Sequence, residues 1–352
     1  MKALRWHGAR DLRYEDVPEP DAPSVGQALV EVSYCGVCGT DLHEYLAGPH
    51  MIRAKSHPLT KWVPPFALGH EMSGTVLALG SPAAGVKVGD RVAVDPCWLC
   101  GTCRWCVRGE YHLCPLGGSV GLASPGAFAD QVIVPTAGLV PLPDDVPDDM
   151  AALAEPMAVA LHAVSRADLR PGENVLILGA GPIGMAILLC ARLAGAAGIF
   201  VSEPVAARRE RATALGATEA MDPAQHDVRR EVFLRTGRVG PDVVIEATGV
   251  ASLTPLAITT VRRGGRVVLA GVTDGGTTID PTQLLFYERS LHGSLGYNFD
   301  IPRVVSLMQA GRLDVSALIT GRYPLSAGLD VFRELEADKD SHLKVLLTPK
   351  EN

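Results

Sequence analysis

The sequence predicts an α/β protein in which a compact β domain is followed by a doubly wound parallel sheet. Its 352 residues suffice for two domains, each with its own hydrophobic core. Pro and Gly divide roughly the first 150 residues into short strands and turns, whereas apolar runs alternate with helical patterns from residue 174 onward. Such alternation favours a parallel sheet with helices on both faces.

Three strands are expected in the β domain. Residues 28–34 alternate apolar and polar side chains, residues 72–79 are rich in strand-forming types, and residues 86–94 contain a Gly-Asp turn. A helical pattern follows over residues 148–167.

The doubly wound region begins at residues 174–178, a continuous apolar run as expected of a strand that is buried on both faces. The segment from residue 297 onward contains two helical patterns and a final strand at 343–348. Between these regions, strands are expected at 199–202, 219–221, 242–246, 266–270 and 291–293, with helices that include 185–194 and 205–215.

Four cysteines lie close together in the sequence, with gaps of two, two and seven residues. This spacing lets four thiolates converge on one tetrahedral Zn²⁺, and four sulfurs close its coordination shell. The alternatives are disulfides or scattered core thiols, but the first residues carry no apolar segment of a secretory signal. The sequence therefore predicts a structural zinc lobe at about 95–117, with ligands Cys100, Cys103, Cys106 and Cys114.

A glycine motif directly follows the strand at 174–178 and opens a helix, which is the context of a dinucleotide site. Glu203 closes the next strand, where a carboxylate accepts the ribose hydroxyls of NAD and repels the 2′-phosphate of NADP. Arg208 is a cation that can tolerate that phosphate, and Glu203 and Arg208 can also be a solvated pair at a helix start. The motif residues expected to contact the coenzyme are Gly179, Gly181, Pro182, Ile183 and Gly184.

A second metal site is expected from Cys38, His70, Glu71 and Glu155. A thiolate, an imidazole and one carboxylate leave a four-coordinate zinc with one exchangeable position, as in catalytic sites. Taken singly, these residues are also compatible with a buried thiol, a core histidine and a surface carboxylate. Their occurrence beside the four-cysteine lobe and the glycine motif favours the metal.

The chain resembles the zinc-dependent medium-chain dehydrogenases in the order and spacing of residues 36–43, 69–71, 88–92, the four-cysteine lobe and 179–184. The resemblance implies a GroES-like β-barrel catalytic domain over 1–157 and a Rossmann NAD-binding domain over 158–296. The segment 297–352 then returns to the catalytic domain. Two zinc ions per chain, one structural and one catalytic, and NAD are the implied cofactors.

The resemblance also implies residue roles at the catalytic zinc. Glu155 stands where the ethanol-oxidising branch carries a cysteine, which is typical of the polyol and diol branch. The ligands are then Cys38, His70 and either Glu71 or Glu155. A proton is expected to pass from Thr40 through the nicotinamide ribose to His43, although the two side chains can also be a helix cap and a surface histidine. Coenzyme contacts are further implied for Arg208, Thr248, Val272 and Lys344.

The segments 41–49 and 57–60 are similar to those of 2,3-butanediol dehydrogenases, with a departure at 61–65 that includes Trp62. The expected activity is hydride transfer between NAD and a secondary alcohol or ketone, with 2,3-butanediol and acetoin as substrates. A sorbitol-like polyol dehydrogenase and an L-threonine dehydrogenase are the alternatives. A loop that serves subunit contacts would explain the same segments.

Composition excludes several other function classes. The net charge of −7 and the pI near 5.8 give no basic face for nucleic acid, which disfavours a zinc-stapled nucleic-acid module. A relative that binds only nucleotide is disfavoured because Cys38, His70 and Glu71 are intact. Apolar stretches are too short for a membrane span. A cytoplasmic homo-oligomer, a dimer or a tetramer, is expected.

Overall fold

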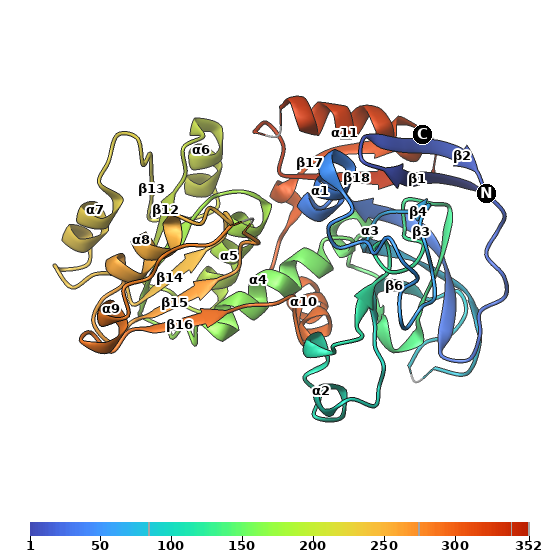
Figure 1. Ribbon diagram of the computed structural model, residues 1–352, viewed down its shortest axis with the longest axis horizontal. Helices are drawn as coiled ribbons and strands as arrows, with labels where there is room; N and C mark the ends of the chain where they lie inside the picture. Colours follow the sequence, from blue (N-terminus) through green and yellow to red (C-terminus); the bar gives the residue numbers. More distant parts are fainter. Residues whose placement is uncertain (84, 274, 339, 351–352) are drawn as a thin grey trace. The chain divides into compact units, whose positions relative to one another are not determined.

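The computed structural model describes residues 1–83, 85–273, 275–338 and 340–350. Two compact units make up the chain (Figure 1). The first consists of Met1–Glu155 together with Ile301–Asn352, and the second consists of Pro156–Asp300. The C-terminal segment is thus part of the same unit as the N-terminal one.

The first unit is built on a seven-stranded sheet. Strand β18 (Lys344–Thr348) pairs antiparallel with β3 (Gln27–Gly36), so the end of the chain completes the sheet that the N-terminal part begins. The other strands are β10 (Leu139–Pro141), β6 (Arg91–Val94), β5 (Glu71–Leu79), β17 (Ile319–Pro324) and β9 (Gln131–Pro135). A smaller sheet contains β1 (Lys2–Gly8), β2 (Asp11–Asp16) and β4 (Phe66–Ala67). Another consists of β7 (Cys97–Trp98) and β8 (Gly118–Ser119).

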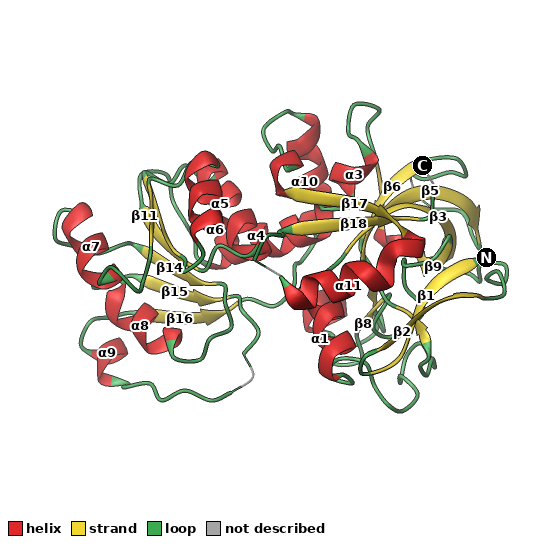
Figure 2. Ribbon diagram, turned by 90° about the horizontal axis from the view of Figure 1, so that it is seen from above, coloured by secondary structure: helices red, strands yellow, loops and turns green. Residues whose placement is uncertain are grey.

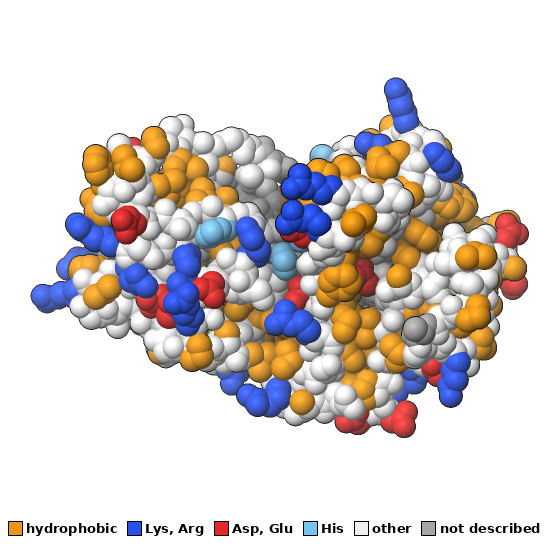
Figure 3. Space-filling model, turned by 90° about the horizontal axis from the view of Figure 1, so that it is seen from below, with side chains coloured by type: hydrophobic (Ala, Val, Ile, Leu, Met, Phe, Trp, Pro, Cys, Tyr) orange, Lys and Arg blue, Asp and Glu red, His pale blue; other side chains and the backbone are white. Residues whose placement is uncertain are grey.

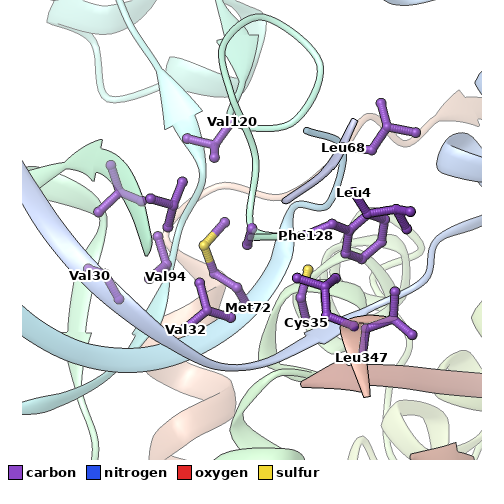
Figure 4. Close-up of a cluster of buried hydrophobic side chains, with 14 of the residues drawn as sticks. Leu4, Val30, Val32, Cys35, Leu68, Met72, Val94, Val120, Phe128 and Leu347 are labelled. Carbon is purple, nitrogen blue, oxygen red and sulfur yellow. The ribbon is translucent and has the colours of Figure 1, made fainter. Parts of the chain in front are cut away.

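The core of this unit lies between the sheet and the strands that fold over it (Figure 4). Val30 and Val32 lie two residues apart in β3 and share one face of the sheet, because successive side chains of a strand point to opposite faces. Both are buried on that face. Met72, Phe128 and Leu347 meet them from distant parts of the sequence. Burial of Leu347 stabilises the return of the C-terminal strand.

Two elements of the first unit differ from their predicted bounds. The expected strand 86–94 is strand only at Arg91–Val94, because Gly89 adopts a left-handed φ of 91° in a turn. The helical pattern at 148–167 divides into α3 (Asp148–Ala151) and α4 (Ala154–Arg166). Pro156 explains this break, since a proline ring clashes with the carbonyl four residues earlier and is tolerated only in a first turn.

The remaining helices of the first unit are short or lie at its surface. They are α1 (Gly39–Ala47), α2 (Arg104–Val107), α10 (Asp300–Gln309) and α11 (Gly328–Ala337). The strands of this unit that were not predicted from the sequence are β1, β2, β4, β7, β8, β9, β10 and β17. No helix within the described residues combines the length and the apolar character that crossing a membrane requires.

The second unit is a parallel sheet of six strands in the order β13-β12-β11-β14-β15-β16, which confirms the predicted doubly wound fold. Figure 2 shows helices on both sides of this sheet. The strands are β11 (Asn174–Leu178), β12 (Gly198–Ser202), β13 (Glu219–Met221), β14 (Val243–Glu246), β15 (Arg266–Leu269) and β16 (Ser290–Gly293). The helices are α5 (Pro182–Leu193), α6 (Ala206–Ala214), α7 (Val228–Arg235), α8 (Leu253–Thr260) and α9 (Thr282–Leu285).

Candidate functional site

The four-cysteine lobe has the geometry of a tetrahedral metal site. The Cys100 Sγ atom lies 3.5 Å from that of Cys114 and 3.9 Å from that of Cys106. Four sulfurs at about 2.3 Å from one zinc ion stand roughly 3.8 Å apart, so these separations fit the ion. The backbone N–H groups of Cys103 and Cys106 donate to the sulfurs of Cys100 and Cys103, each at 3.4 Å.

Two of these cysteines, Cys100 and Cys106, have opposite electrostatic surroundings. Backbone N–H groups of Thr102 and Cys103 lower the pKa of Cys100 to about 6. Burial and the neighbouring Cys103 raise the pKa of Cys106 to about 12. A divalent ion at this site would favour the thiolate form of these residues, since the thiolate is the form of cysteine that binds a metal.

A second group of metal-binding atoms comes from Cys38, His70 and Glu71, whose ligand atoms all lie within 4.8 Å of one another. Cys38 caps α1 just after β3, and Glu71 begins β5, which pairs with β3. Gly69 has a φ of 94°, and a Cβ there would lie 2.7 Å from Phe128. The glycine therefore permits the turn that brings His70 to the cluster.

Asp41 orients this cluster, a role that sequence reasoning missed. Its buried carboxylate accepts from the backbone N–H of Cys38 at 3.0 Å and of Gly69 at 3.3 Å, and lies 3.5 Å from His70 Nδ1. Burial lowers the pKa of His70, but Asp41 and Cys38 outweigh burial and raise this pKa well above its usual value. The negative field that favours a proton here favours a divalent cation equally.

Lys344 lies in the first unit with its ammonium group buried against Glu71. Its Nζ donates to Glu71 Oε1 and lies 3.5 Å from the Val37 carbonyl. Although burial lowers the pKa of Lys344, Glu71, Cys38 and Glu155 together outweigh burial and raise this pKa, so the ammonium stays charged. Glu71 Oε2 is buried and has no hydrogen-bond partner within the described residues, which leaves it available to a metal. The predicted contact of Lys344 with the coenzyme stays a prediction.

Glu155 lies in the first turn of α4 and is partly buried. Burial raises its pKa to about 7; His70 opposes this shift and Glu71 adds to it. Its oxygens are not among the atoms that form the metal-binding group within the described residues. A Glu71 oxygen does belong to this group, so the structure brings together three of the four predicted ligands.

Thr40 and His43 occupy adjacent turns of α1, where residues three apart face the same side of a helix. Thr40 is partly buried, and the Cys38 thiol lies 3.7 Å from its Oγ1. His43 is exposed to solvent. Thr40 therefore lies beside the metal-binding group, and His43 lies one turn further along α1 at the surface; the predicted proton path between them stays a prediction.

The glycine motif lies in the second unit between β11 and α5, and each of its three positions favours glycine for a different reason. Gly179 has a φ of 96°, and a Cβ on Gly184 would lie 2.0 Å from the Gly179 carbonyl oxygen. Gly181 has an ordinary φ of −69°, and a Cβ there would contact nothing within 4 Å. Neither backbone conformation nor packing requires glycine at 181, so the open space fits a ligand at the start of α5, whose first residues are Pro182 and Ile183.

Glu203 directly follows β12 and is 4% exposed. Its carboxylate accepts from the backbone N–H of Ala180 at 2.7 Å and of Val205 at 2.9 Å. The carboxylate retains capacity for further donors, since it offers about four acceptor positions. Arg208 is partly buried on α6. Its neighbour Arg209 donates to the Glu203 and Pro204 carbonyls at 2.8 and 2.7 Å, a support that the sequence did not reveal.

Thr248 and Val272 follow β14 and β15 at the same edge of the sheet as the glycine motif. The Thr248 backbone N–H donates to the buried carboxylate of Glu246 at 2.7 Å, and its hydroxyl donates to the same oxygen. Val272 is 80% exposed. The carboxyl ends of parallel strands are where doubly wound sheets bind ligands, and these residues lie there.

Comparison with known proteins gives two family matches and full-length relatives. The family described as alcohol dehydrogenase GroES-like domain matches residues 24–144, and the zinc-binding dehydrogenase family matches residues 182–310. The (R,R)-butanediol dehydrogenase of Bacillus subtilis is 37% identical over 99% of this chain and 100% of its own length. The sorbitol dehydrogenase of Bacillus subtilis is 33% identical over 99% of this chain and 97% of its own length. The L-threonine 3-dehydrogenase of Pyrococcus horikoshii is 34% identical over 95% of this chain and 92% of its own length.

Solved structures agree with these relatives. The crystal structure of 2R,3R-butanediol dehydrogenase from Bacillus subtilis has a TM-score of 0.93 and 36% identity, and it covers 99% of both chains. A zinc-binding dehydrogenase from Sinorhizobium meliloti bound to NADP has a TM-score of 0.89 and 32% identity, also over 99% of both chains.

Proposed function

Because the chain belongs to the zinc-binding dehydrogenases with a GroES-like alcohol dehydrogenase domain, we propose that it interconverts 2,3-butanediol and acetoin with NAD as hydride carrier. The full-length likeness to a butanediol dehydrogenase, in sequence and in fold, carries the proposal. The Cys38, His70 and Glu71 group supports it, because a thiolate, an imidazole and a carboxylate form a zinc site with an open position.

The residues present have defined tasks in this reaction. Cys38, His70 and one of Glu71 or Glu155 would hold the catalytic zinc, which when bound polarises the substrate hydroxyl while NAD⁺ accepts the hydride. Thr40 takes the hydroxyl proton, and the exposed His43 on the same face of α1 releases it to solvent. Asp41 holds the His70 ring in place through its position at Nδ1. The four-cysteine lobe would hold the second, structural zinc.

The presence of two carboxylates supports a diol as substrate. Glu71 and Glu155 cannot both ligate a four-coordinate zinc that keeps an open position, so one carboxylate is available to accept a hydrogen bond from a second substrate hydroxyl. A site that binds a hydroxyl rejects analogues that lack it, because a buried acceptor is then left without a partner. A polyol or L-threonine would satisfy the same acceptor, and relatives with those activities make them the alternative substrates.

A substrate panel tests this proposal. With NAD⁺ and purified protein, oxidation of a 2,3-butanediol stereoisomer should exceed oxidation of 2-butanol, sorbitol and L-threonine by about tenfold or more in kcat/KM, which equals about 1.4 kcal/mol. Equal rates with 2-butanol would contradict the role of the second carboxylate. Faster oxidation of sorbitol or threonine would establish the alternative.

NAD is proposed over NADP because of Glu203. A 2′-phosphate would approach a buried carboxylate, which is costly. We expect a preference for NAD⁺ of about tenfold or more in kcat/KM, and Glu203→Ala should reduce it. Equal use of both coenzymes by the wild-type protein would show that Arg208 outweighs Glu203.

The proposal extends to assembly and compartment. None of the eight cysteines, all within the described residues, forms a disulfide, which suits the reducing cytoplasm. A homo-oligomer, dimer or tetramer, is proposed for the chain, and light scattering after size-exclusion chromatography would measure its mass. A mass of a single 37.2 kDa chain would contradict it.

A further inference from the structure

A cavity of about 450 Å³ in the second unit is not used by the proposed reaction. It is lined by α7, the end of α8 and the segments that precede β15 and β16. The end of α8 and the segments before β15 and β16 lie at the amino ends of strands, whereas the glycine motif, Glu203 and Thr248 follow the carboxyl ends. Because the sheet is parallel, the cavity and the predicted coenzyme residues lie at opposite edges.

Arginines dominate the charged lining of this cavity, which we name the arginine pocket. Its charged residues are Arg229, Arg230, Arg262, Arg263, Arg289 and a single carboxylate, Asp227.

Most of these cations lack a carboxylate partner. Arg262 pairs with Asp242 at 2.6 Å, and Asp227 accepts from the backbone N–H of Arg230 as the cap of α7. The other four guanidinium groups have no ion pair with any residue that the structure describes. On a chain of net charge −7, this is a local excess of positive charge, and Figure 3 shows Lys and Arg side chains gathered over the second unit, at the left.

Neutral groups hold the guanidinium groups in place. The Cζ atoms of Arg263 and Arg289 lie 4.9 and 4.6 Å from the ring centroid of Tyr287. Arg289 also donates to Gln283 Oε1 at 3.1 Å and to the Arg262 carbonyl at 3.4 Å. Burial lowers the pKa of Arg289, and the nearby Arg229 and Arg263 lower it further. The guanidinium groups are thus held close together although they repel one another, and a bound anion would reduce this repulsion.

Thr260 gives an independent indication of a ligand. This last residue of α8 lines the pocket and is 6% exposed, and its Oγ1 has no hydrogen-bond partner within the described residues. Buried hydroxyl groups are nearly always hydrogen bonded, so an unpartnered one in a cavity wall needs an explanation. An oxygen atom of a bound anion would supply the partner.

We propose that the arginine pocket binds a small oligophosphate, either inorganic or part of a nucleotide. Guanidinium groups match phosphate oxygens with two parallel hydrogen bonds, and several phosphates are needed to reach arginines that come from three separate segments. The volume lies within the range of small-molecule sites, and a recess of this size suits a small anion better than a polymer. The aromatic rings of Phe233 and Tyr287 add an apolar wall that a nucleobase can contact.

Calorimetric titration of the zinc-loaded protein with inorganic tripolyphosphate, in the presence of saturating NADH, tests the site. NADH occupies the glycine motif, so the probe reports on the pocket alone. Arg229→Ala/Arg263→Ala should weaken binding by about tenfold or more, since each charge-assisted bond contributes about that factor. Arg312→Ala, which removes an exposed cation of the first unit, should bind like the wild type. The proposal would be overturned if both variants lost tripolyphosphate affinity equally, or if neither bound tripolyphosphate more weakly than the wild type.

Thr260→Val keeps the shape of the side chain and removes only the hydroxyl. It should weaken tripolyphosphate binding without lowering the unfolding temperature, because no protein group loses a hydrogen bond. Unchanged affinity with a lowered unfolding temperature would mean that Thr260 is structural, and would contradict the site.

A parallel titration with CTP distinguishes the two sources of the phosphate. Tighter binding of CTP than of tripolyphosphate would identify a nucleotide, and equal binding an inorganic anion. Turnover with NAD⁺ should be unchanged in Arg229→Ala/Arg263→Ala, so failure of the pocket and failure of the dehydrogenase proposal remain separate results.

Discussion

Gly181→Ala should weaken coenzyme binding with little change in stability, whereas Gly184→Ala should lower the stability of the fold. The two glycines stand three residues apart in one motif, yet their surroundings differ. A Cβ at 184 would lie 2.0 Å from a backbone oxygen, whereas a Cβ at 181 would contact nothing within 4 Å. Gly184→Ala therefore tests packing, and Gly181→Ala tests the space that a ligand occupies.

The expected magnitudes follow from these surroundings. Gly181→Ala loses a favourable helix cap, worth a few tenths to about 1 kcal/mol, and gains about 0.4–1 kcal/mol from the stiffer unfolded chain, so the free energy of unfolding should change by less than about 1 kcal/mol. Gly184→Ala forces a backbone shift, which costs about 1–3 kcal/mol in a packed interior. The methyl group of Gly181→Ala, in contrast, should raise the dissociation constant for NADH by about tenfold or more.

Urea unfolding and NADH fluorescence titration of both variants check this reasoning. The unfolding midpoint of Gly181→Ala should match the wild type while its NADH affinity falls, and Gly184→Ala should unfold at lower urea. Full NADH affinity in Gly181→Ala would refute the assignment of that open space to the coenzyme. Strong destabilisation of Gly181→Ala would refute the stability argument.

Three further substitutions have definite expected outcomes. Cys103→Ser should remove one of two zinc ions by elemental analysis and lower the yield of folded protein, whereas Cys97→Ser, outside the metal-binding group, should retain both. Lys344→Met should lower the free energy of unfolding by about 3–5 kcal/mol, because it leaves the Glu71 carboxylate buried without its cation; a loss below about 1 kcal/mol would contradict this. Glu44→Ala should lower the thermal midpoint, because the buried Glu44 carboxylate accepts from three successive backbone N–H groups of residues 50–52; an unchanged midpoint would contradict this.

The features that residue spacing alone predicted are local ones, whereas Cys38, His70 and Glu71 were expected together through the family resemblance. The cysteines of the zinc lobe span 15 residues, and the glycine motif spans six, so spacing alone determines which atoms can meet. The parallel sheet followed from apolar runs that need no knowledge of distant partners. Where the bounds of an expected element differed, a single residue intervened: Gly89 of the predicted Gly-Asp turn shortened the strand, and Pro156 divided the helix.

The features that the sequence did not predict depend on distant pairs. Lys344 meets Glu71 across 273 residues, and only the return of β18 to β3 brings them together. No propensity or spacing indicates such a pair. The arginine pocket likewise gathers α7, the end of α8 and the segment before β16, which are separate in the sequence.

The Lys344–Glu71 pair also changes how the two candidate zinc carboxylates should be compared. From the sequence, Glu71 and Glu155 are equivalent acceptors. In the fold, one oxygen of Glu71 accepts a hydrogen bond from the Lys344 ammonium group and the other has no partner within the described residues, so one oxygen is available to a metal. Glu155 has no such cation bound to it among the described residues, and burial disfavours its charge. The C-terminal strand therefore does more than complete a sheet, because it places an ammonium group against a residue of the predicted metal site.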